Sequence, residues 1–224
     1  MLETERAVVA AAARRLAATD LVLGTAGNVS ARSGDLVAIT PTGAALSELT
    51  GEQVSVVGLD GRHVDGALTA SSEIDLHLGA YRRFELTAAV HTHAPISTAL
   101  ACVLDELPVV HYGMLALGGS IRVAPYATFG TPELAESTLD ALDGRLAVLM
   151  ANHGTLALGM SVEQAVENTL LLEWACEVYW RAAQLGAPRI LGDEQCAAVV
   201  EAVVSRNYGK PTAAGAATRA GAGR

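Results

Sequence analysis

The stretch Leu86-Thr87-Ala88-Ala89-Val90-His91-Thr92-His93 is an apolar run that ends in two histidines with one residue between them. The run predicts a buried strand, in which alternate side chains share one face about 6.6 Å apart along the backbone. His91 and His93 can therefore turn ring nitrogens toward one ion. A second apolar run, Leu146 to Ala151, predicts another strand, and His153 follows it closely. Three imidazoles leave the fourth position of a tetrahedral zinc open for substrate or water, as in catalytic zinc sites.

Isolated histidines carry less weight than this set. A lone histidine at a strand end is more often a hydrogen-bonded surface or core residue than a metal ligand, and we interpret His63, His77 and His111 in that way. The paired spacing of His91 and His93, with a third histidine after a similar strand, instead favours one metal site.

The size and charge of the chain limit the classes of protein to which it can belong. Its 224 residues, 51% of them hydrophobic, suffice for one large core, and we expect one domain over residues 1–211. The Ala/Gly/Thr-rich tail over residues 212–224 cannot pack a core and is expected to be disordered. The net charge of −9 speaks against a basic face for phosphate backbones, so no nucleic-acid partner is expected.

The chain shows no targeting or membrane signal. Its first residues, Met1-Leu2-Glu3-Thr4-Glu5-Arg6, carry acids where a secretory signal carries bases, and no apolar run reaches membrane-spanning length. We therefore expect a cytoplasmic protein without a membrane partner. Cys102, Cys176 and Cys196 are odd in number and widely spaced, which matches neither a disulfide framework nor a thiolate zinc site. We expect them to be buried thiols.

Periodicity and capping residues predict a mixture of helices and strands. The expected helices cover residues 3–19, 47–53, 72–83, 95–103, 131–143, 161–186 and 193–206. The expected strands cover residues 36–40, 54–59, 86–93, 108–111, 121–124 and 146–151, and residues 21–32 are interpreted as a Gly/Ser/Thr/Asn-rich loop. Ser72 with Asp75, and Ser161 with Gln164, have the spacing of helix N-terminal caps.

Three short stretches rich in hydroxyl groups and glycine could together surround an anion. They are Thr25-Ala26-Gly27-Asn28-Val29-Ser30, Thr40-Pro41-Thr42-Gly43 and Ser71-Ser72. Glycine allows close backbone approach, the polar side chains supply neutral donors, and a helix that begins after Ser72 points free N–H groups at the same space. Taken singly, each stretch is an ordinary turn or helix cap. Gly24 and Gly27 match neither the Walker loop nor the dinucleotide fingerprint, so a small phosphorylated metabolite is indicated rather than a nucleotide.

These residues resemble the class II aldolase/adducin family from about residue 16 to residue 209. The resemblance is carried by Gly24-Thr25-Ala26-Gly27-Asn28-Val29-Ser30, Ile39-Thr40-Pro41-Thr42-Gly43, Ser71-Ser72-Glu73, His91-Thr92-His93, Tyr126-Ala127-Thr128-Phe129-Gly130-Thr131 and Asn152-His153-Gly154. It implies a single α/β domain of three layers, α/β/α, with a mostly antiparallel central sheet. It also implies a homotetramer of four-fold symmetry with zinc-dependent sites at the subunit interfaces.

The resemblance, matched residue by residue, assigns roles within the site. His91, His93 and His153 would hold one zinc ion per subunit, with another divalent metal as the alternative. Glu73 would be the general base, and Tyr112 would donate a proton from the neighbouring subunit. The phosphate contacts would be Thr25, Gly27, Asn28, Thr42, Gly43, Ser71 and Ser72. Phe129 and Tyr208 would close over the substrate.

The implied reaction is the cleavage of a ketose 1-phosphate, L-fuculose 1-phosphate or a related sugar, to dihydroxyacetone phosphate and an aldehyde through a metal-bound enediolate. Zinc acts as a Lewis acid toward the enediolate, and Glu73 moves protons. Without the histidines, Glu73 would be interpreted as an acid that complements the first turn of a helix. The only lysine is Lys210, at the edge of the tail, so Schiff-base and pyridoxal phosphate chemistry are not expected.

Other activities within the same family are alternatives to the aldolase. They are 4-epimerases, dehydratases and decarboxylases that act on sugar phosphates, and non-catalytic adducin-like scaffolds. An epimerase pattern would place an acid in the loop after His111, whereas residues 112–120 contain none. A scaffold would lack the histidine triad. The sequence therefore favours an aldolase, and L-fuculose, D-ribulose and 5-deoxypentulose 1-phosphates all remain as candidate substrates.

Overall fold

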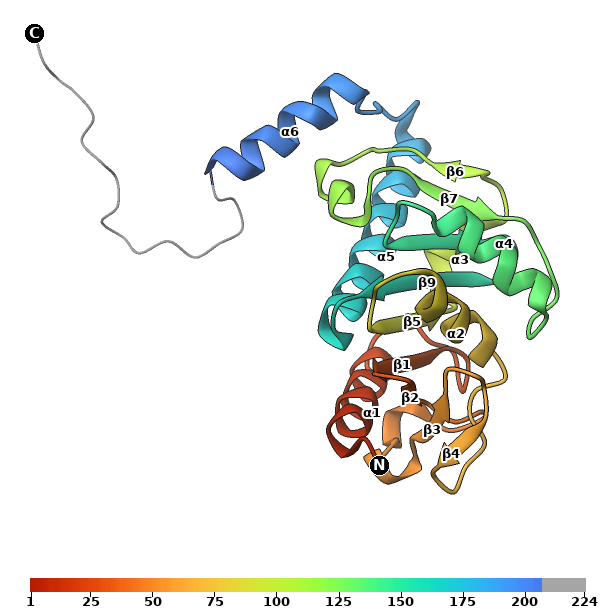
Figure 1. The fold of residues 1–224 in the computed structure, drawn as a ribbon. Helices are drawn as coiled ribbons and strands as arrows, with labels where there is room; N and C mark the ends of the chain where they lie inside the picture. The colour runs from red at the N-terminus through yellow and green to blue at the C-terminus, as the bar shows by residue number, and fades with distance from the viewer. Residues whose placement is uncertain (207–224) are drawn as a thin grey trace, which may run out of the picture. The chain divides into compact units, whose positions relative to one another are not determined.

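Nine strands of the described residues form one sheet in the order β4-β3-β2-β1-β5-β9-β8-β7-β6 (Figure 1). The structure is a computed structural model that describes residues 1–206. The strands are β1 (Asn28–Ser33), β2 (Leu36–Ile39), β3 (Ser55–Gly58), β4 (His63–Asp65), β5 (Ala88–Thr92), β6 (Glu106–Leu107), β7 (Ile121–Ala124), β8 (Ala147–Met150) and β9 (Gly154–Gly159). Neighbouring strands are antiparallel except β7 and β8, which are parallel. The predicted, mostly antiparallel sheet is confirmed.

Helices cover both faces of this sheet (Figure 1). They are α1 (Glu3–Ala17), α2 (Ile74–Arg83), α3 (Pro95–Ala101), α4 (Pro132–Leu142) and α5 (Val162–Leu185), with short 3-10 helices at Leu46–Glu48, Gly51–Gln53 and Tyr112–Leu117. On one face, Val9 of α1 and Val166 of α5 share a buried cluster with Val29 of β1. On the other face, Leu78 of α2 and Leu142 of α4 belong to a second buried cluster. Each such side chain, when fully buried, contributes about 1.5–3 kcal/mol to the stability of the fold. The predicted three-layer α/β/α fold is confirmed.

Strand β1 presents a different chemistry to each layer. Side chains alternate between the two faces of a strand. Val29 and Ala31 belong to the apolar cluster under α1 and α5, whereas Ser30 bonds to His77 and Tyr81 of α2. The layer that contains α2 therefore holds polar groups inside an otherwise apolar core.

The position of β9 brings the two histidine-bearing segments to one edge of the sheet. β9 lies between β5 and β8 and is antiparallel to both. Thr92 at the end of β5 pairs with Thr155 near the start of β9, and Met150 at the end of β8 pairs with Gly154. The end of β5 and the turn over residues 151–153 consequently meet at the same edge.

Two strands differ from the sequence prediction. Residues 28–33 form β1, although residues 21–32 were expected to be a loop, because the polar side chains of this strand find partners on α2 instead of water. Residues 154–159 form β9, for which no element was expected. This strand is short, buried along its whole length and bounded by glycines, so it has no alternation that would reveal it.

Two local predictions are also wrong. Helix α2 has Glu73 at its N-cap, and the hydroxyl of Ser71 accepts from the Glu73 N–H at 3.2 Å, so the cap is not the predicted pair of Ser72 and Asp75. The strand expected over residues 108–111 is replaced by β6, which pairs with β7 before Pro108. Proline has no N–H for the ladder, which ends there.

Residues 1–190 form one compact unit, and α6 (Asp193–Arg206) belongs to a second unit that begins at Leu191. The predicted boundary at residue 211 and the predicted disorder of the tail lie outside the described residues and stay predictions. The three cysteines are free, but only Cys176 is buried, and the prediction of burial is wrong for Cys102, which is exposed. None of the helices described in residues 1–206 has the length and apolar character to cross a membrane. The cytoplasmic location stays a prediction.

Candidate active site

Three histidine rings meet at the sheet edge where β5 and β8 end. The ring centroids of His91 and His93 lie 4.8 Å apart, and that of His153 lies 4.9 Å from the first and 5.0 Å from the second. Their ring planes are steeply inclined, at 73° to 81° to one another. One ligand atom from each ring and one from Glu73 all lie within 4.8 Å of one another. The structure therefore brings together the three predicted ligands and the predicted base.

The orientation of the His91 ring is determined by a backbone carbonyl. His91 is fully buried, and its Nδ1 donates to the carbonyl oxygen of Thr155 at 2.8 Å. A carbonyl can only accept, so Nδ1 carries a proton, and Nε2 is the nitrogen left to bind a metal. This Nε2 atom lies 2.9 Å from Nε2 of His93. Metal-binding histidines are commonly oriented by such a hydrogen bond at the other ring nitrogen.

Glu73 adds a negative charge to the same cluster. Its Oε2 lies 3.1 Å from His91 Nε2, and its Oε1 lies 3.0 Å from His153 Nε2. Burial alone would raise the pKa of the Glu73 carboxyl, but the contacts with His153 and His91 outweigh burial and hold that pKa well below its usual range. Oε2 also accepts from the amide of Asn28 at 2.9 Å, whereas the buried Oε1 makes no such amide contact and faces His153. The carboxylate therefore has one oxygen held by Asn28 and one that faces the histidines.

The atoms of the cluster suit a divalent cation. Burial, reinforced by the neighbouring His91 and His153, lowers the pKa of His93 to about 4, so this imidazole is neutral at pH 7 and has a lone pair to donate. Zinc binds imidazole nitrogens at about 2.0–2.1 Å, so two ligands of one ion can be at most about 4.2 Å apart. The 2.9 Å between Nε2 of His91 and of His93 lies within that limit. Three imidazoles with one carboxylate fit zinc or a similar transition metal.

Two glycines allow the backbone to pack closely around the end of β5. Gly27 has a φ of +90°, and a Cβ there would lie 3.0 Å from the carbonyl oxygen of His91. A Cβ on Gly154 would lie 2.2 Å from the carbonyl oxygen of Thr92 and 3.1 Å from Cδ2 of His93. Any larger residue at either position would push the surrounding strands away from the histidines.

A cavity of about 400 Å³ opens beside the histidines. Glu73, His93 and His153 line it. All seven residues expected to contact a phosphate also line it, namely Thr25, Gly27, Asn28, Thr42, Gly43, Ser71 and Ser72. Among the described residues that line the cavity there is no lysine or arginine. An anion in this cavity would therefore be held by neutral donors, by the positive end of α2 and by the metal.

Asn28 has a second role that its sequence neighbourhood did not reveal. It is 4% exposed, its amide nitrogen donates to Glu73, and its amide oxygen accepts from Nε2 of His77. At most one amide hydrogen of Asn28 is thus available to a ligand. Its predicted contact with the phosphate stays a prediction.

The remaining predicted residues occupy different places. Phe129 lines the cavity and is 67% exposed. Tyr112 begins a 3-10 helix, and the centroid of its ring lies 4.3 Å from the ring centroid of His111. It does not line the cavity of its own chain. Its predicted role in a neighbouring subunit stays a prediction. Tyr208 lies outside the described residues.

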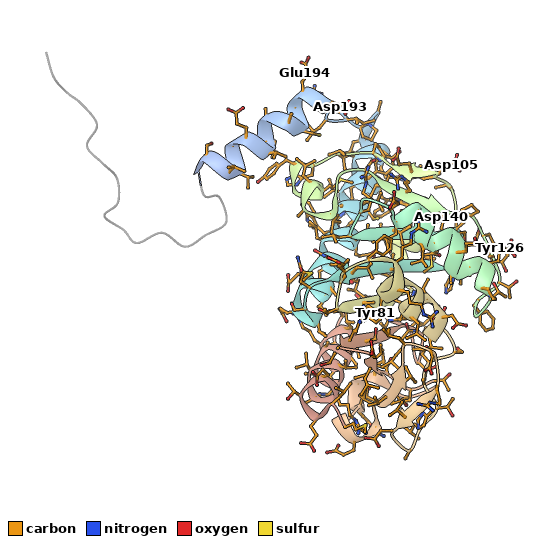
Figure 2. All side chains as sticks on the ribbon, viewed as in Figure 1. Tyr81, Asp105, Tyr126, Asp140, Asp193 and Glu194 are labelled. Atoms are coloured by element: carbon orange, nitrogen blue, oxygen red, sulfur yellow. The ribbon has the colours of Figure 1, made fainter. Side chains whose placement is uncertain are left out.

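Sequence reasoning assigned no part in the site to three residues that the structure places at or next to it, although it correctly interpreted one of them, His77, as a hydrogen-bonded core residue. Tyr126 and Asn152 line the cavity, and Figure 2 shows Tyr126 projecting from the segment that precedes α4. Asn152 takes a left-handed φ of 55°, which asparagine tolerates better than most residues, and it donates to Sγ of Cys102 at 3.3 Å. His77 bonds to Asn28. The sequence did contain a signal that His77 lies near the site, because His77 follows Glu73 by four residues, the spacing of side chains on one helix face.

Comparison with known proteins accounts for this arrangement. The family described as Class II Aldolase and Adducin N-terminal domain has a model that matches residues 7–180. The chain belongs to this family. The resemblance inferred from the motifs is thereby confirmed.

Characterised members of the class II aldolase family are similar over most of the chain. A 5-deoxy-D-ribulose 1-phosphate aldolase of Bacillus thuringiensis is 36% identical over 198 residues, which cover 87% of this chain and 93% of the relative. A 5-methylthioribulose-1-phosphate/5-deoxyribulose-1-phosphate aldolase of Rhodospirillum rubrum is 39% identical over 192 residues, or 85% and 86% of the two chains. The solved structure of an L-fuculose 1-phosphate aldolase superposes with a TM-score of 0.86 at 35% identity, covering 90% of this chain and 96% of the other. The prediction of a lyase of the class II aldolase type agrees with all three.

Proposed function

We propose that this protein is a metal-dependent aldolase that cleaves a ketose 1-phosphate to dihydroxyacetone phosphate and an aldehyde. The observation that carries the proposal is the continuity of one site, in which three imidazoles and a carboxylate adjoin a cavity with a neutral, hydroxyl-rich lining. The names of its relatives support the substrate class, since each specifies a sugar 1-phosphate. We propose 5-deoxyribulose 1-phosphate and L-fuculose 1-phosphate as the first substrates to test.

His91, His93 and His153 would hold the metal, for which we propose zinc. When bound, the ion would supply Lewis-acid stabilisation of the negative charge that develops on substrate oxygens as the carbon–carbon bond breaks. The alternative route through an imine needs a lysine in the site, and residues 1–206 contain none.

Glu73 is the proposed general base. It is ionised, and its Oε1 faces His153 Nε2 at 3.0 Å. Once that nitrogen gives its lone pair to a metal, Oε1 would be the carboxylate oxygen able to accept a proton from a substrate hydroxyl. The other oxygen, Oε2, is held by the Asn28 amide, which keeps the carboxylate in one orientation. Such a base contributes about 10²–10⁴-fold to the rate.

The substrate phosphate is proposed to lie where the neutral donors line the cavity. Thr25, Thr42 and Ser72 are exposed there, and α2 begins immediately after Glu73. The free N–H groups and dipole of the helix would add to the attraction of the hydroxyl donors. Phe129, in contrast to these polar donors, is exposed and apolar, and we propose that it contacts the aldehyde part of the sugar.

We also propose that the site is completed by a second subunit. Tyr112 is the proposed proton donor but does not line the cavity of its own chain, so it would act on a neighbour's substrate. A homotetramer, proposed by resemblance to the family, provides such neighbours. Tyr208 would contribute to closure of the site in the same assembly.

The proposal can be tested with the purified full chain. After removal of metal with a chelator, zinc is returned, and dihydroxyacetone phosphate is detected by a coupled, NADH-dependent reductase on a panel of ketose 1-phosphates. We expect turnover that depends on zinc and differs among the sugars. A zinc-loaded protein that is inert toward every ketose 1-phosphate would contradict the proposal and favour a non-catalytic scaffold.

Two histidine variants provide a matched control for metal binding. His93→Ala removes a proposed ligand and should abolish both stoichiometric zinc and turnover. His63→Ala removes an exposed histidine whose ring nitrogen bonds to the carbonyl of Gly66, and it should keep both zinc and turnover. Equal zinc content in the two variants would exclude His93 as a ligand.

A further inference from the structure

A continuous line of buried polar side chains leads from the carboxylate of Glu73 into the core. Asn28 Nδ2 lies 2.9 Å from Glu73 Oε2, and Asn28 Oδ1 is hydrogen-bonded to His77 Nε2. The other nitrogen of that ring, Nδ1, lies 2.6 Å from Ser30 Oγ, which in turn lies 2.6 Å from the hydroxyl of Tyr81. Tyr81 is labelled in Figure 2. We call these four residues, Asn28, His77, Ser30 and Tyr81, the relay.

The relay is built by a strand and a helix that face each other. Asn28 and Ser30 lie two residues apart on β1 and therefore share one face of the strand. His77 and Tyr81 lie four residues apart on α2 and share one face of the helix. His77 and Ser30 are completely inaccessible to solvent, and Tyr81 is 2% exposed. Bulk water therefore does not reach the bonds that join His77, Ser30 and Tyr81.

The direction of every hydrogen bond in the relay follows from the amide of Asn28, whose Nδ2 donates to Glu73 Oε2. A carboxylate only accepts, so Asn28 must present its NH₂ group to Glu73 and its oxygen to His77. That oxygen only accepts, so His77 must carry its proton on Nε2, which leaves Nδ1 as an acceptor in the neutral ring. Ser30 must then donate to Nδ1 and accept from the hydroxyl of Tyr81. Each bond is determined by the one before it.

We propose that His77, with Ser30 and Tyr81 behind it, is a positioning residue for the general base Glu73, a role that rests on the proposed function. The Nε2–H group of His77 keeps the amide of Asn28 from rotating by half a turn. In the rotated amide, an oxygen instead of an N–H would face Glu73 Oε2, and the two oxygens would repel each other. The relay thus keeps Oε2 bound and leaves Oε1 to accept the substrate proton.

Burial and completeness distinguish the relay from an incidental set of contacts. A buried polar group without a partner costs about 1–3 kcal/mol, and each link of the relay satisfies its neighbours. Burial, reinforced by the neighbouring His91, lowers the pKa of His77 to about 3, which agrees with a neutral ring. Burial also raises the pKa of Tyr81 well above its usual range, so the phenol keeps the proton that it donates.

Two substitutions of His77 separate its two hydrogen bonds. The side-chain nitrogen of glutamine reaches approximately the place of Nε2, so His77→Gln keeps the donor to Asn28 and loses the acceptor for Ser30. The side-chain oxygen of asparagine reaches approximately the place of Nδ1, so His77→Asn keeps the acceptor for Ser30 and loses the donor to Asn28. The two variants have similar polarity and both leave a cavity, which makes them controls for each other.

We expect the loss of the donor to matter more than the loss of the acceptor. His77→Asn should lower kcat about 10²-fold, the effect expected when a catalytic group is displaced by about 1 Å, and His77→Gln should lower it less than about tenfold. The KM for the ketose phosphate and the zinc content should stay close to wild type in both variants. Equal kcat values in the two zinc-loaded variants would overturn the proposal.

A spectroscopic measurement of the His77 tautomer tests the relay on the wild-type protein and does not depend on catalytic turnover. In ¹⁵N-histidine-labelled, zinc-loaded wild-type protein, long-range ¹H–¹⁵N correlation should show His77 as the Nε2–H tautomer at pH 7, with its signals identified by their loss in His77→Gln. An Nδ1–H tautomer or a charged ring would overturn the proposal. If the wild type cleaves no ketose phosphate, the proposed function fails. The tautomer of His77 still tests which atoms donate and which accept in the hydrogen bonds of the relay.

Discussion

Replacing Gly154 with alanine should force β5 and β9 apart at the point where the histidine rings meet. The new Cβ would lie 2.2 Å from the carbonyl oxygen of Thr92 and 3.1 Å from Cδ2 of His93. An ordinary close contact between carbon and oxygen is about 3.3 Å, so the two strands must separate by about 1 Å. The carbonyl of Thr92 belongs to a buried backbone ladder and cannot simply rotate away.

The size of the effect follows from this clash. Overpacking of a buried site costs about 1–3 kcal/mol, and in a chain of this length each kcal/mol lowers the melting temperature by about 2–4 °C. The expected loss is therefore about 2–12 °C in the metal-free protein. The displacement also separates His93 from His153, which directly precedes Gly154, and should weaken zinc binding about 10–100-fold.

The measurement combines thermal unfolding of the metal-free protein with a zinc titration against a chromophoric chelator. Gly51→Ala is the matched control, because a Cβ there meets no atom closer than 3.5 Å. It should unfold and bind zinc as the wild type does. If Gly154→Ala also behaves like the wild type in both assays, the close approach of β9 to the end of β5 is not required for the metal site.

Three further perturbations address the carboxylate, the neighbouring subunit and the buried histidine. Glu73→Gln should keep zinc and fold but lower kcat about 10²–10⁴-fold in the coupled assay, and full activity would remove Glu73 from the role of base. Tyr112→Phe should slow cleavage with little change in metal content, and an unchanged rate would assign the proton to another group. Acidification should destabilise the metal-free protein: the pKa of His77 is lowered by burial to about 3, so from the unfolded value of 6.5 downward only the unfolded chain takes up the proton. By pH 5 this proton uptake lowers the free energy of unfolding by about 2 kcal/mol. In urea titrations at the two pH values, His77→Gln should lose less stability than the wild type. Equal losses would exclude His77 as the source of the acid sensitivity.

Local signals in the sequence were sufficient to predict most of the helices and the shared orientation of His91 and His93. Capping by Ser161 and Thr131 and the apolar periodicity that follows determine where α5 and α4 begin, because both features act within one or two helical turns. The spacing of His91 and His93 similarly depends only on the two-residue repeat of a strand. The family motifs and the absence of lysine before residue 210 also belong to the sequence itself.

Predictions failed where a segment depends on partners that are distant in the chain. Residues 28–33 have the composition of a loop, but they form a central strand that pairs with β2 and β5, and His77 of α2 bonds to the polar side chains of Asn28 and Ser30. Residues 154–159 are too short and too uniformly apolar to show a strand repeat, and their pairing with β5 and β8 defines them. Ser72 has the spacing of a cap, yet α2 has Glu73 at its N-cap, and no side chain of the described residues caps the helix.

By itself, the sequence determined the classes of chemistry open to this protein: an acidic, lysine-poor α/β chain with a paired histidine motif and neutral, hydroxyl-rich loops. Only the tertiary structure decided that His153 joins His91 and His93, since this depends on the antiparallel insertion of β9 between β5 and β8. The same is true of the link from Glu73 through Asn28 to His77, which joins residues 45 and 49 positions apart. Local propensity acts over a few residues, whereas a site is made by contacts that close long loops, and those contacts exist only once the core has formed.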